Sequence, residues 1–157
     1  MHTTNPPCSR MLTFRPPRIA TLLVAIAAAL QWTDLGVLPE LPGSAAAAVL
    51  LALAGWSLMV RAWWLFRKAD TGICPTGKAR RLITNDVYMW TRNPMYLGIV
   101  MMMSSVGMAT GSLYHFLAAG VFFAIIDHSF CPYEEENLSR LFGDAFRKYR
   151  VQTRRWL

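Results

Sequence analysis

One stretch of the sequence decides the fold: LITNDVYMWTRNPMYLG, residues 82–98, in which a polar and basic segment turns into an apolar helix. Pro94 has a fixed φ and no backbone N–H, so it suits the first turn of that helix. Arg92 precedes it, and the hydroxyls of Tyr88 and Tyr96 lie at the same boundary. Backbone N–H groups at a helix start and an arginine can together bind a small polar molecule with an anionic group. The same residues also suit an ordinary anchor at a membrane interface.

The composition around this stretch indicates an integral membrane domain. Of the 157 residues, 54% are hydrophobic and only 16% are charged, which is too apolar for an ordinary soluble domain. The net charge of +7 comes from basic residues that flank the apolar segments without forming a continuous stripe, so we expect no nucleic-acid partner. The three cysteines show no CxxC or Cys/His spacing, so we expect neither a disulfide nor a metal site.

Four apolar segments predict an all-α, polytopic membrane protein. They cover residues 19–30, which can extend to 38, and residues 45–66, 96–110 and 113–131. About 20 apolar residues in a helix are enough to cross a hydrocarbon core of about 30 Å. Residues 1–18 are polar and Pro-rich, which predicts a flexible tail before a single membrane domain over residues 19–157. The basic residues and short apolar core near the N-terminus also fit a cleavable signal sequence, which is the alternative to a retained first helix.

The basic residues predict the orientation of these helices. All 16 Lys and Arg lie before residue 19, between residues 61 and 92, or after residue 139, whereas the turns on the other side contain only Asp34 and Glu40 as charged residues. By the positive-inside rule, both termini and the long segment 67–92 face the cytoplasm. We therefore expect a multi-pass protein of the lipid bilayer, with the bacterial inner membrane as its location.

A second polar group follows the fourth apolar segment. Three glutamates lie at residues 134–136, and apolar residues then recur at helical spacing over residues 138–149. This spacing predicts a C-terminal amphipathic helix that lies along the membrane surface. The three carboxylates either favour the N-terminus of that helix electrostatically or point in part into the bundle. Asp127 and His128 lie at the end of the fourth span, where ionisable groups are costly, so a polar pocket is plausible there.

Together these stretches resemble the isoprenylcysteine carboxyl methyltransferase family of membrane enzymes, which is similar in topology to the phospholipid N-methyltransferases. The residues that match the family pattern are Leu82, Thr84, Tyr88, Arg92, Pro94, Tyr96, Leu97, Gly98, Glu134, Glu135, Leu138, Phe142, Gly143, Tyr149, Arg155 and Trp156. The resemblance covers residues 80–157, with order and spacing intact. Asn93 replaces the family's His, and Ser129 stands where the eukaryotic carboxyl methyltransferases carry an Arg. The second departure argues against a prenylcysteine carboxylate as the acceptor.

The resemblance implies a transferase that moves the methyl group of S-adenosylmethionine (SAM) to a lipophilic or small acceptor at the cytoplasmic membrane face. The acceptor group is a carboxylate, a thiol or an amine. The implied catalytic residues are Arg92, Glu134 and Glu135, with Glu134 favoured at the reacting centre. The implied cofactor-binding residues are Tyr88, Arg92, Asn93, Pro94, Tyr96, Leu97 and Glu135. Methyl transfer is an in-line displacement that alignment in a dry site promotes, and it requires no metal.

The alternative from another class is a non-catalytic four-helix membrane protein, such as a small transporter or an assembly factor. A proton-coupled transporter is expected to carry an acidic residue in the middle of a membrane span. Every acid in this sequence falls near the end of a span. The sequence therefore favours the methyltransferase, and it leaves the acceptor and the oligomeric state open.

Overall fold

The computed structural model describes residues 16–33, 35–38, 44–70 and 80–157. Over these residues the chain is helical and contains no β-strand. The elements are α2 (Pro16–Gln31), α3 (Ser44–Lys68), the 3-10 helix η1 (Asp86–Met89), α4 (Pro94–Thr110), α5 (Leu113–Ile125), the π-helix η2 (Ile126–Phe130), α6 (Cys131–Phe142) and α7 (Asp144–Gln152). The predicted all-α class is confirmed. The turn at residues 39–43 and most of the tail predicted over residues 1–18 lie outside the described residues.

Two helices are long and apolar enough to cross a membrane. They are α3, with 25 residues, and the uninterrupted helix from Leu113 to Phe142, with 30 residues. The other two helices of the bundle are shorter: α2 has 16 residues and α4 has 17. At 1.5 Å per residue these are about 24 and about 26 Å long, against a hydrocarbon core of about 30 Å. The structure therefore supports two membrane spans by length and composition, and four spans remain a prediction.

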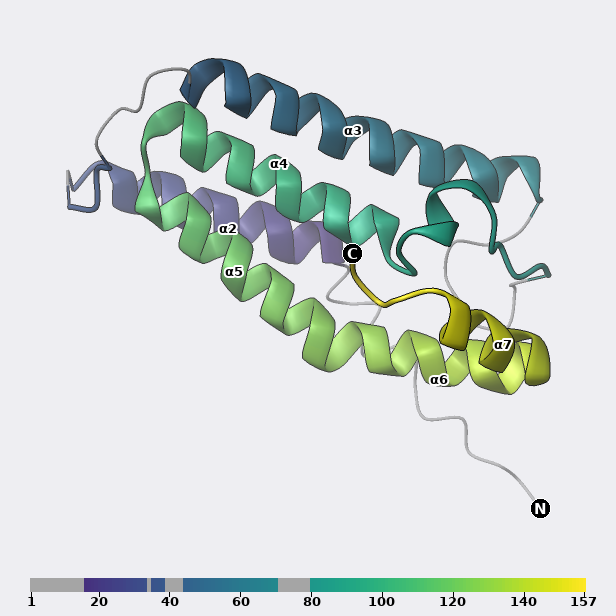
Figure 1. Cartoon of the computed structure of the whole chain (residues 1–157). Coiled ribbons are helices and arrows are strands. Elements are labelled where there is room, and N and C mark those ends of the chain that lie inside the picture. The colour runs from purple at the N-terminus through teal and green to yellow at the C-terminus, as the bar shows by residue number, and fades with distance from the viewer. Residues whose placement is uncertain (1–15, 34, 39–43, 71–79) are drawn as a thin grey trace.

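Helices α2 to α5 run back and forth along a common direction, so that their ends gather at two poles of the molecule (Figure 1). At one pole, the segment after α2 pairs with the turn between α4 and α5. The N–H of Leu38 donates to the carbonyl of Gly111 at 2.6 Å, and the N–H of Leu113 donates to the carbonyl of Gly36 at 3.0 Å. Gly111 has a φ of +59°, a conformation that glycine adopts without a steric penalty, so the tight turn predicted there is confirmed.

Helices α3 and α4 pack closely because each contributes a glycine at the crossing point. A Cβ added to Gly98 would lie 2.5 Å from Cγ of Met59 and 2.6 Å from the carbonyl oxygen of Gly55. A Cβ on Gly55 would lie 2.8 Å from the carbonyl oxygen of Gly98. Small residues of this kind let membrane helices approach until their backbones touch. This contact fixes the position of the start of α4, and therefore also the position of the polar residues that precede Pro94.

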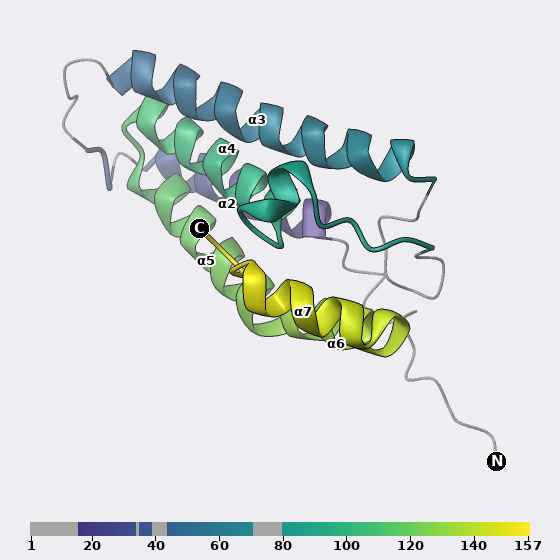
Figure 2. The ribbon, with the colours of Figure 1, turned by 45° about the vertical axis from the view of Figure 1, so that its right-hand side comes forward.

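The region after the fourth apolar segment differs from the prediction. The helix does not stop near Cys131, because α5 continues through the π-helix η2 into α6 as far as Phe142. Gly143, with a φ of +50°, then reverses the chain, and α7 lies beside α6 (Figures 1 and 2). The single amphipathic helix predicted over residues 138–149 is therefore wrong, since this glycine divides it in two.

The same continuity removes one interpretation of the three glutamates. Glu134, Glu135 and Glu136 lie in the interior of the Leu113–Phe142 helix, where the preceding turns are already helical. The favourable interaction of acids with a helix N-terminus falls off within the first turn of a helix. These side chains must instead be explained by what each of them contacts.

Candidate active site

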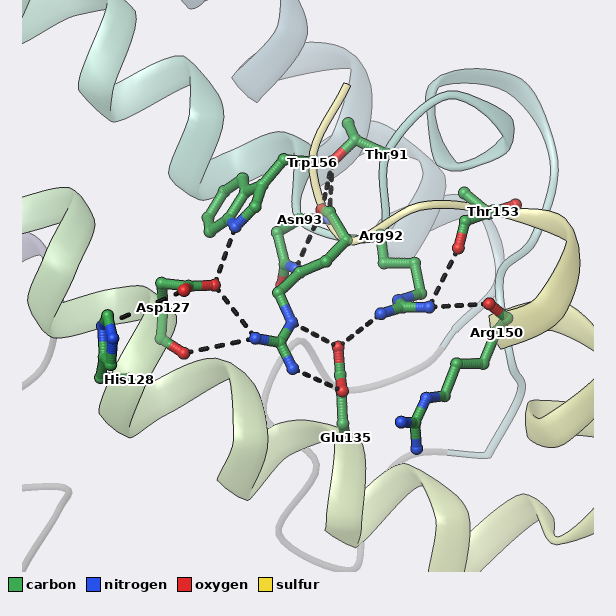
Figure 3. Close-up of polar contacts among 10 residues, drawn as sticks. Thr91, Arg92, Asn93, Asp127, His128, Glu135, Arg150, Thr153 and Trp156 are labelled. Carbon is green, nitrogen blue, oxygen red and sulfur yellow. Dashed lines mark hydrogen bonds and ion pairs between the residues drawn. The ribbon is translucent and has the colours of Figure 1, made fainter.

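The candidate site lies at the second pole, where the loop before α4 meets the π-helix η2, the start of α6 and the segment after α7 (Figure 3). Asn93 is the residue before α4, and Pro94 is its first residue, as the sequence predicts. Both side chains are buried. Because Pro94 fixes the start of the helix, Arg92 leaves the loop at a defined place and points toward α6 (Figure 3).

Glu135 is the centre of a cluster with two arginines. Arg92 Nη2 donates to Oε1 of Glu135 at 2.8 Å. Arg155 donates through Nε to the same oxygen at 2.9 Å and through Nη2 to Oε2 at 3.0 Å. The side chains of Arg92 and Glu135 are each only 11% exposed. Charge-assisted and bidentate hydrogen bonds of this kind are the strong ones in proteins, so the cluster joins three distant parts of the chain rigidly.

Arg92 also ties the loop to the segment that follows α7. Its Nη1 donates to the carbonyls of Arg150 at 2.9 Å and Thr153 at 3.0 Å, and its backbone N–H donates to the carbonyl of Arg154 at 3.0 Å. The hydroxyl of Thr91 adds a bond to the carbonyl of Arg155 at 2.8 Å. Three donors of the Arg92 side chain are thus engaged by protein acceptors.

The Asn93 amide takes part in the same contact. Its Nδ2 donates to the carbonyl of Arg155 at 3.3 Å, and its backbone N–H donates to the hydroxyl of Thr91 at 3.2 Å. Where the related family has a His, this chain therefore has a buried side chain that holds the C-terminal segment through a neutral hydrogen bond. A role that requires a titratable group at position 93 is lost.

Asp127 extends the cluster and was not among the site residues that the sequence predicted. Arg155 Nη1 donates to Oδ1 of Asp127 at 3.0 Å, and Trp156 Nε1 donates to the same oxygen at 2.9 Å (Figure 3). The indole also packs against Phe123, with ring centroids 4.7 Å apart. His128 is exposed, and its Nδ1 lies 2.9 Å from the carbonyl of Ala124 and 4.0 Å from Oδ2, the other carboxylate oxygen of Asp127 (Figure 3).

The sequence contained a signal for these residues, because Arg155 and Trp156 belong to the matching motif and Asp127 is a costly acid at the end of an apolar segment. What the sequence does not show is that they meet. Hydrogen bonds of Asp127 to residues 28 and 29 positions away depend on the reversal at Gly143.

Glu134 faces a different neighbour from Glu135. The hydroxyl of Tyr96, on α4, donates to Oε1 of Glu134 at 2.6 Å. Successive helical residues point about 100° apart, so adjacent glutamates reach different elements. No described residue donates a hydrogen bond to Oε2 of Glu134 or forms an ion pair with this side chain. Glu136, by contrast, is exposed and pairs with Arg140 along the helix surface.

Tyr88 lies in a second core cluster with Ala62, Leu65, Phe146 and Tyr149. Its ring meets that of Phe66 edge to face, and its carbonyl accepts a hydrogen bond of 2.7 Å from the hydroxyl of Tyr149. Burial raises the pKa of the Tyr88 hydroxyl well above its usual range, and the charges of Tyr149 and Glu134 add to the effect. The side chain is therefore part of a packed core next to the site, and the negative charge of Glu134 contributes to its raised pKa.

The remaining predicted residue, Leu97, is half-buried in the first turn of α4. The structure thus brings together Arg92 with Glu135, and Tyr96 with Glu134, while Asn93 and Pro94 lie between Arg92 and Tyr96 at the start of α4. One polar atom in this group is buried without a partner among the described residues, namely Nε of Arg92. It can donate to an anionic group of a bound molecule, so the residues present fit the carboxylate of SAM at this point.

The fold and the site define the class of protein: an all-helical chain with helices that can cross a membrane, and a cluster of acidic and basic side chains at one pole. The sequence profile of the phospholipid methyltransferase family matches residues 44–145, about two thirds of the chain, and the protein belongs to this family. The resemblance predicted from the motifs is confirmed, and membership indicates a membrane methyltransferase. Comparisons with curated proteins and with solved structures gave no match.

Proposed function

We propose that this protein transfers the methyl group of SAM to a lipophilic or small acceptor at the cytoplasmic face of a membrane. The observation that carries the proposal is the position of the Tyr96–Glu134 pair beside the cluster of Arg92, Glu135 and Arg155. Both halves of the family motif meet there, at one pole of the bundle. Such a site gives a polar cofactor from the cytosol and an apolar acceptor from the bilayer access to the same place.

The chain's own residues take distinct parts in this proposal. Nε is the one nitrogen of the Arg92 guanidinium that is buried without a partner among the described residues, and we assign it to the carboxylate of SAM. Glu135 accepts three hydrogen bonds, so it acts by holding Arg92 and Arg155 in place. Tyr96 orients Glu134, which we place at the reacting centre. When bound, SAM supplies a methyl group on a positively charged sulfur, and alignment in a site that excludes water provides most of the rate.

The proposal includes four membrane spans with both termini in the cytoplasm. Two observations support it: α2 and α4 are apolar and run along the two longer helices, and the basic residues within the described ranges lie on elements that meet at the pole that holds the site. At the end of α3, Arg67 stacks on Trp63 and Lys68 on Trp64, each 5.0 Å from the ring centre. Aromatic and basic residues together are typical of the membrane interface. A reporter fused after Leu157 that is read on the non-cytoplasmic side would contradict this topology.

SAM binding to the detergent-purified protein tests the cofactor assignment. Arg92→Ala removes a charge-assisted contact of roughly 1.5–3 kcal/mol, so the Kd for SAM should rise by about one to two orders of magnitude. Because Arg92 also holds the C-terminal segment, Thr91→Val is the matched control: it removes a bond to that segment and the bond from the Asn93 N–H, and leaves the arginine in place. An unchanged Kd in folded Arg92→Ala protein would return the arginine to the role of an interfacial anchor.

A further inference from the structure

One residue in the loop that leads to the site has a strained backbone. Asp86, the first residue of η1, has a φ of +61°, in the left-handed region that side chains other than glycine rarely adopt. Among the described residues, the only other non-glycine residue with a positive φ is Asp70, just after α3. A residue keeps such a conformation only where the surrounding structure holds it there.

A charged residue of α3 holds Asp86. Arg61 Nε donates to Oδ2 of Asp86 at 3.0 Å, and Nη2 of the same guanidinium donates to the same oxygen. The other carboxylate oxygen, Oδ1, accepts the N–H of Val87 at 2.8 Å. The guanidinium also lies over the ring of Trp64, 4.8 Å from its centre, which limits the positions that it can take. Both oxygens of the carboxylate are engaged, so the backbone of Asp86 can turn only if these bonds break.

Hydrogen bonds connect Asp86 to the site. The carbonyl of the next residue, Val87, accepts the N–H groups of Trp90 at 3.3 Å and Thr91 at 3.4 Å. Thr91 directly precedes Arg92, whose guanidinium donates to Glu135 on α6. Residues 87–91 are therefore one short hydrogen-bonded unit, and the conformation of Asp86 sets the direction in which this unit leads to Arg92.

We propose that Arg61 is a positioning residue of the site: its ion pair keeps Asp86 in the left-handed conformation, and so keeps Arg92 in place for the cofactor. The last step of the inference rests on the proposed function, whereas the hold on the loop does not require SAM. Helix α3 contributes no residue to the cluster of Arg92, Glu135 and Arg155, and this pair gives it a part in the site.

The alternative is that Arg61 is only an interfacial charge, since arginine side chains near the end of an apolar helix extend to the membrane surface. The two interpretations differ in the residues that can replace Asp86. Glycine adopts a positive φ without a steric penalty, whereas alanine does not. If the ion pair offsets a strained backbone, glycine at position 86 makes Arg61 dispensable and alanine makes the loop open. If Arg61 is only an interfacial charge, the two substitutions have the same effect.

Amide hydrogen exchange of residues 87–92 in the detergent-purified protein, followed by mass spectrometry, measures how often the loop opens. The ion pair is partly exposed, so Arg61→Ala should lower the protection of these amides by about 1.5- to 5-fold. In that background, Asp86→Gly should be better protected than Asp86→Ala by about 5- to 30-fold, because both lose the carboxylate and only alanine keeps the strain. Arg140→Ala, which removes an exposed pair on α6, is the control without effect.

Equal protection of the glycine and alanine variants, or no loss in Arg61→Ala, would overturn the inference. The single variants Asp86→Gly and Asp86→Ala allow the same comparison in protein that keeps Arg61, so the result does not depend on the folding of the double variants.

Addition of SAM tests the last step. A ligand that binds only to the closed loop adds its binding free energy to loop closure, so SAM at about 100 times its Kd should raise the protection of residues 87–92 by up to about 100-fold. Bound SAM that leaves these amides unchanged would overturn the positioning role of Arg61. A wild-type protein that binds no SAM would overturn the proposed function, and the exchange of the Asp86 variants would still decide whether Arg61 holds the loop.

Discussion

Replacement of Glu135 by Gln should destabilise the whole protein, because this carboxylate holds two guanidinium groups at once. Glutamine keeps the size of the side chain and removes its charge, so Arg92, only 11% exposed, loses its counter-ion. Arg155 keeps its bonds to Asp127, and for that reason the loss is smaller than the sum of three charge-assisted bonds. Removal of one partner from a buried ion pair costs about 3–5 kcal/mol, and we expect a value near the lower end.

The matched comparison is Glu136→Gln, one residue further along the same helix. Glu136 is 61% exposed and pairs with Arg140, and a surface pair of this spacing contributes about 0.3–0.5 kcal/mol. For a chain of this size, 1 kcal/mol shifts the Tm by about 2–4 °C. Glu135→Gln should therefore lower the Tm by about 6–12 °C in detergent, followed by far-ultraviolet circular dichroism, and Glu136→Gln by less than about 2 °C. Equal shifts in the two variants would refute the argument that the cluster holds the fold together.

Three further predictions concern packing, the C-terminal segment and pH. Gly98→Ala should destabilise the protein by about 1–3 kcal/mol, because the added Cβ meets the neighbouring helix at 2.5 Å. Gly120→Ala, in the interior of α5 with nothing within 4 Å, should instead stabilise it by about 0.5–1 kcal/mol in thermal unfolding, through helix propensity alone. Trp156→Phe keeps an aromatic ring, smaller than the indole, but loses the N–H bond to the Asp127 carboxylate, so denaturant titration should show a loss of about 1.5–3 kcal/mol, against no change for the exposed Trp90→Phe. Burial raises the pKa of the Tyr149 hydroxyl above its unfolded value of about 10, so its stabilising contribution is complete below that pH and is lost as the pH rises further. The free energy of unfolding, measured between neutral and alkaline pH, should therefore decline less steeply in Tyr149→Phe than in the wild-type protein.

The sequence predicted the parts of the site that local rules govern. Pro94 marks the start of α4, and the two motifs place Arg92 and the glutamate pair on different elements that meet at the site. The 100° turn between adjacent helical residues separates Glu134 from Glu135, and the structure gives them different partners. These features depend on helix geometry and on proline, both of which can be read from the chain.

The end of the long helix could not be predicted in this way. A proline at residue 132 followed by three acids has the appearance of a helix start, since proline cannot donate a backbone hydrogen bond and acids favour an N-terminus. The π-helix over Ile126–Phe130 widens the turn just before Pro132, and the helix continues. No residue pattern in this stretch distinguishes the two outcomes, because a π-turn depends on the packing around it. The meeting of Asp127 with Trp156 follows from that continuation and could not be predicted either.

The attachment of the C-terminal segment has a consequence for biosynthesis. The carbonyls of residues 150 and 153–155 accept the bonds from Thr91, Arg92 and Asn93, and all of these acceptors follow the last membrane helix in the chain. During translation the helices therefore reach the bilayer while Arg92 still lacks most of its partners. The site closes only after residue 155 has left the ribosome, so a chain that stops after α6 would insert its helices normally and yet never assemble the site.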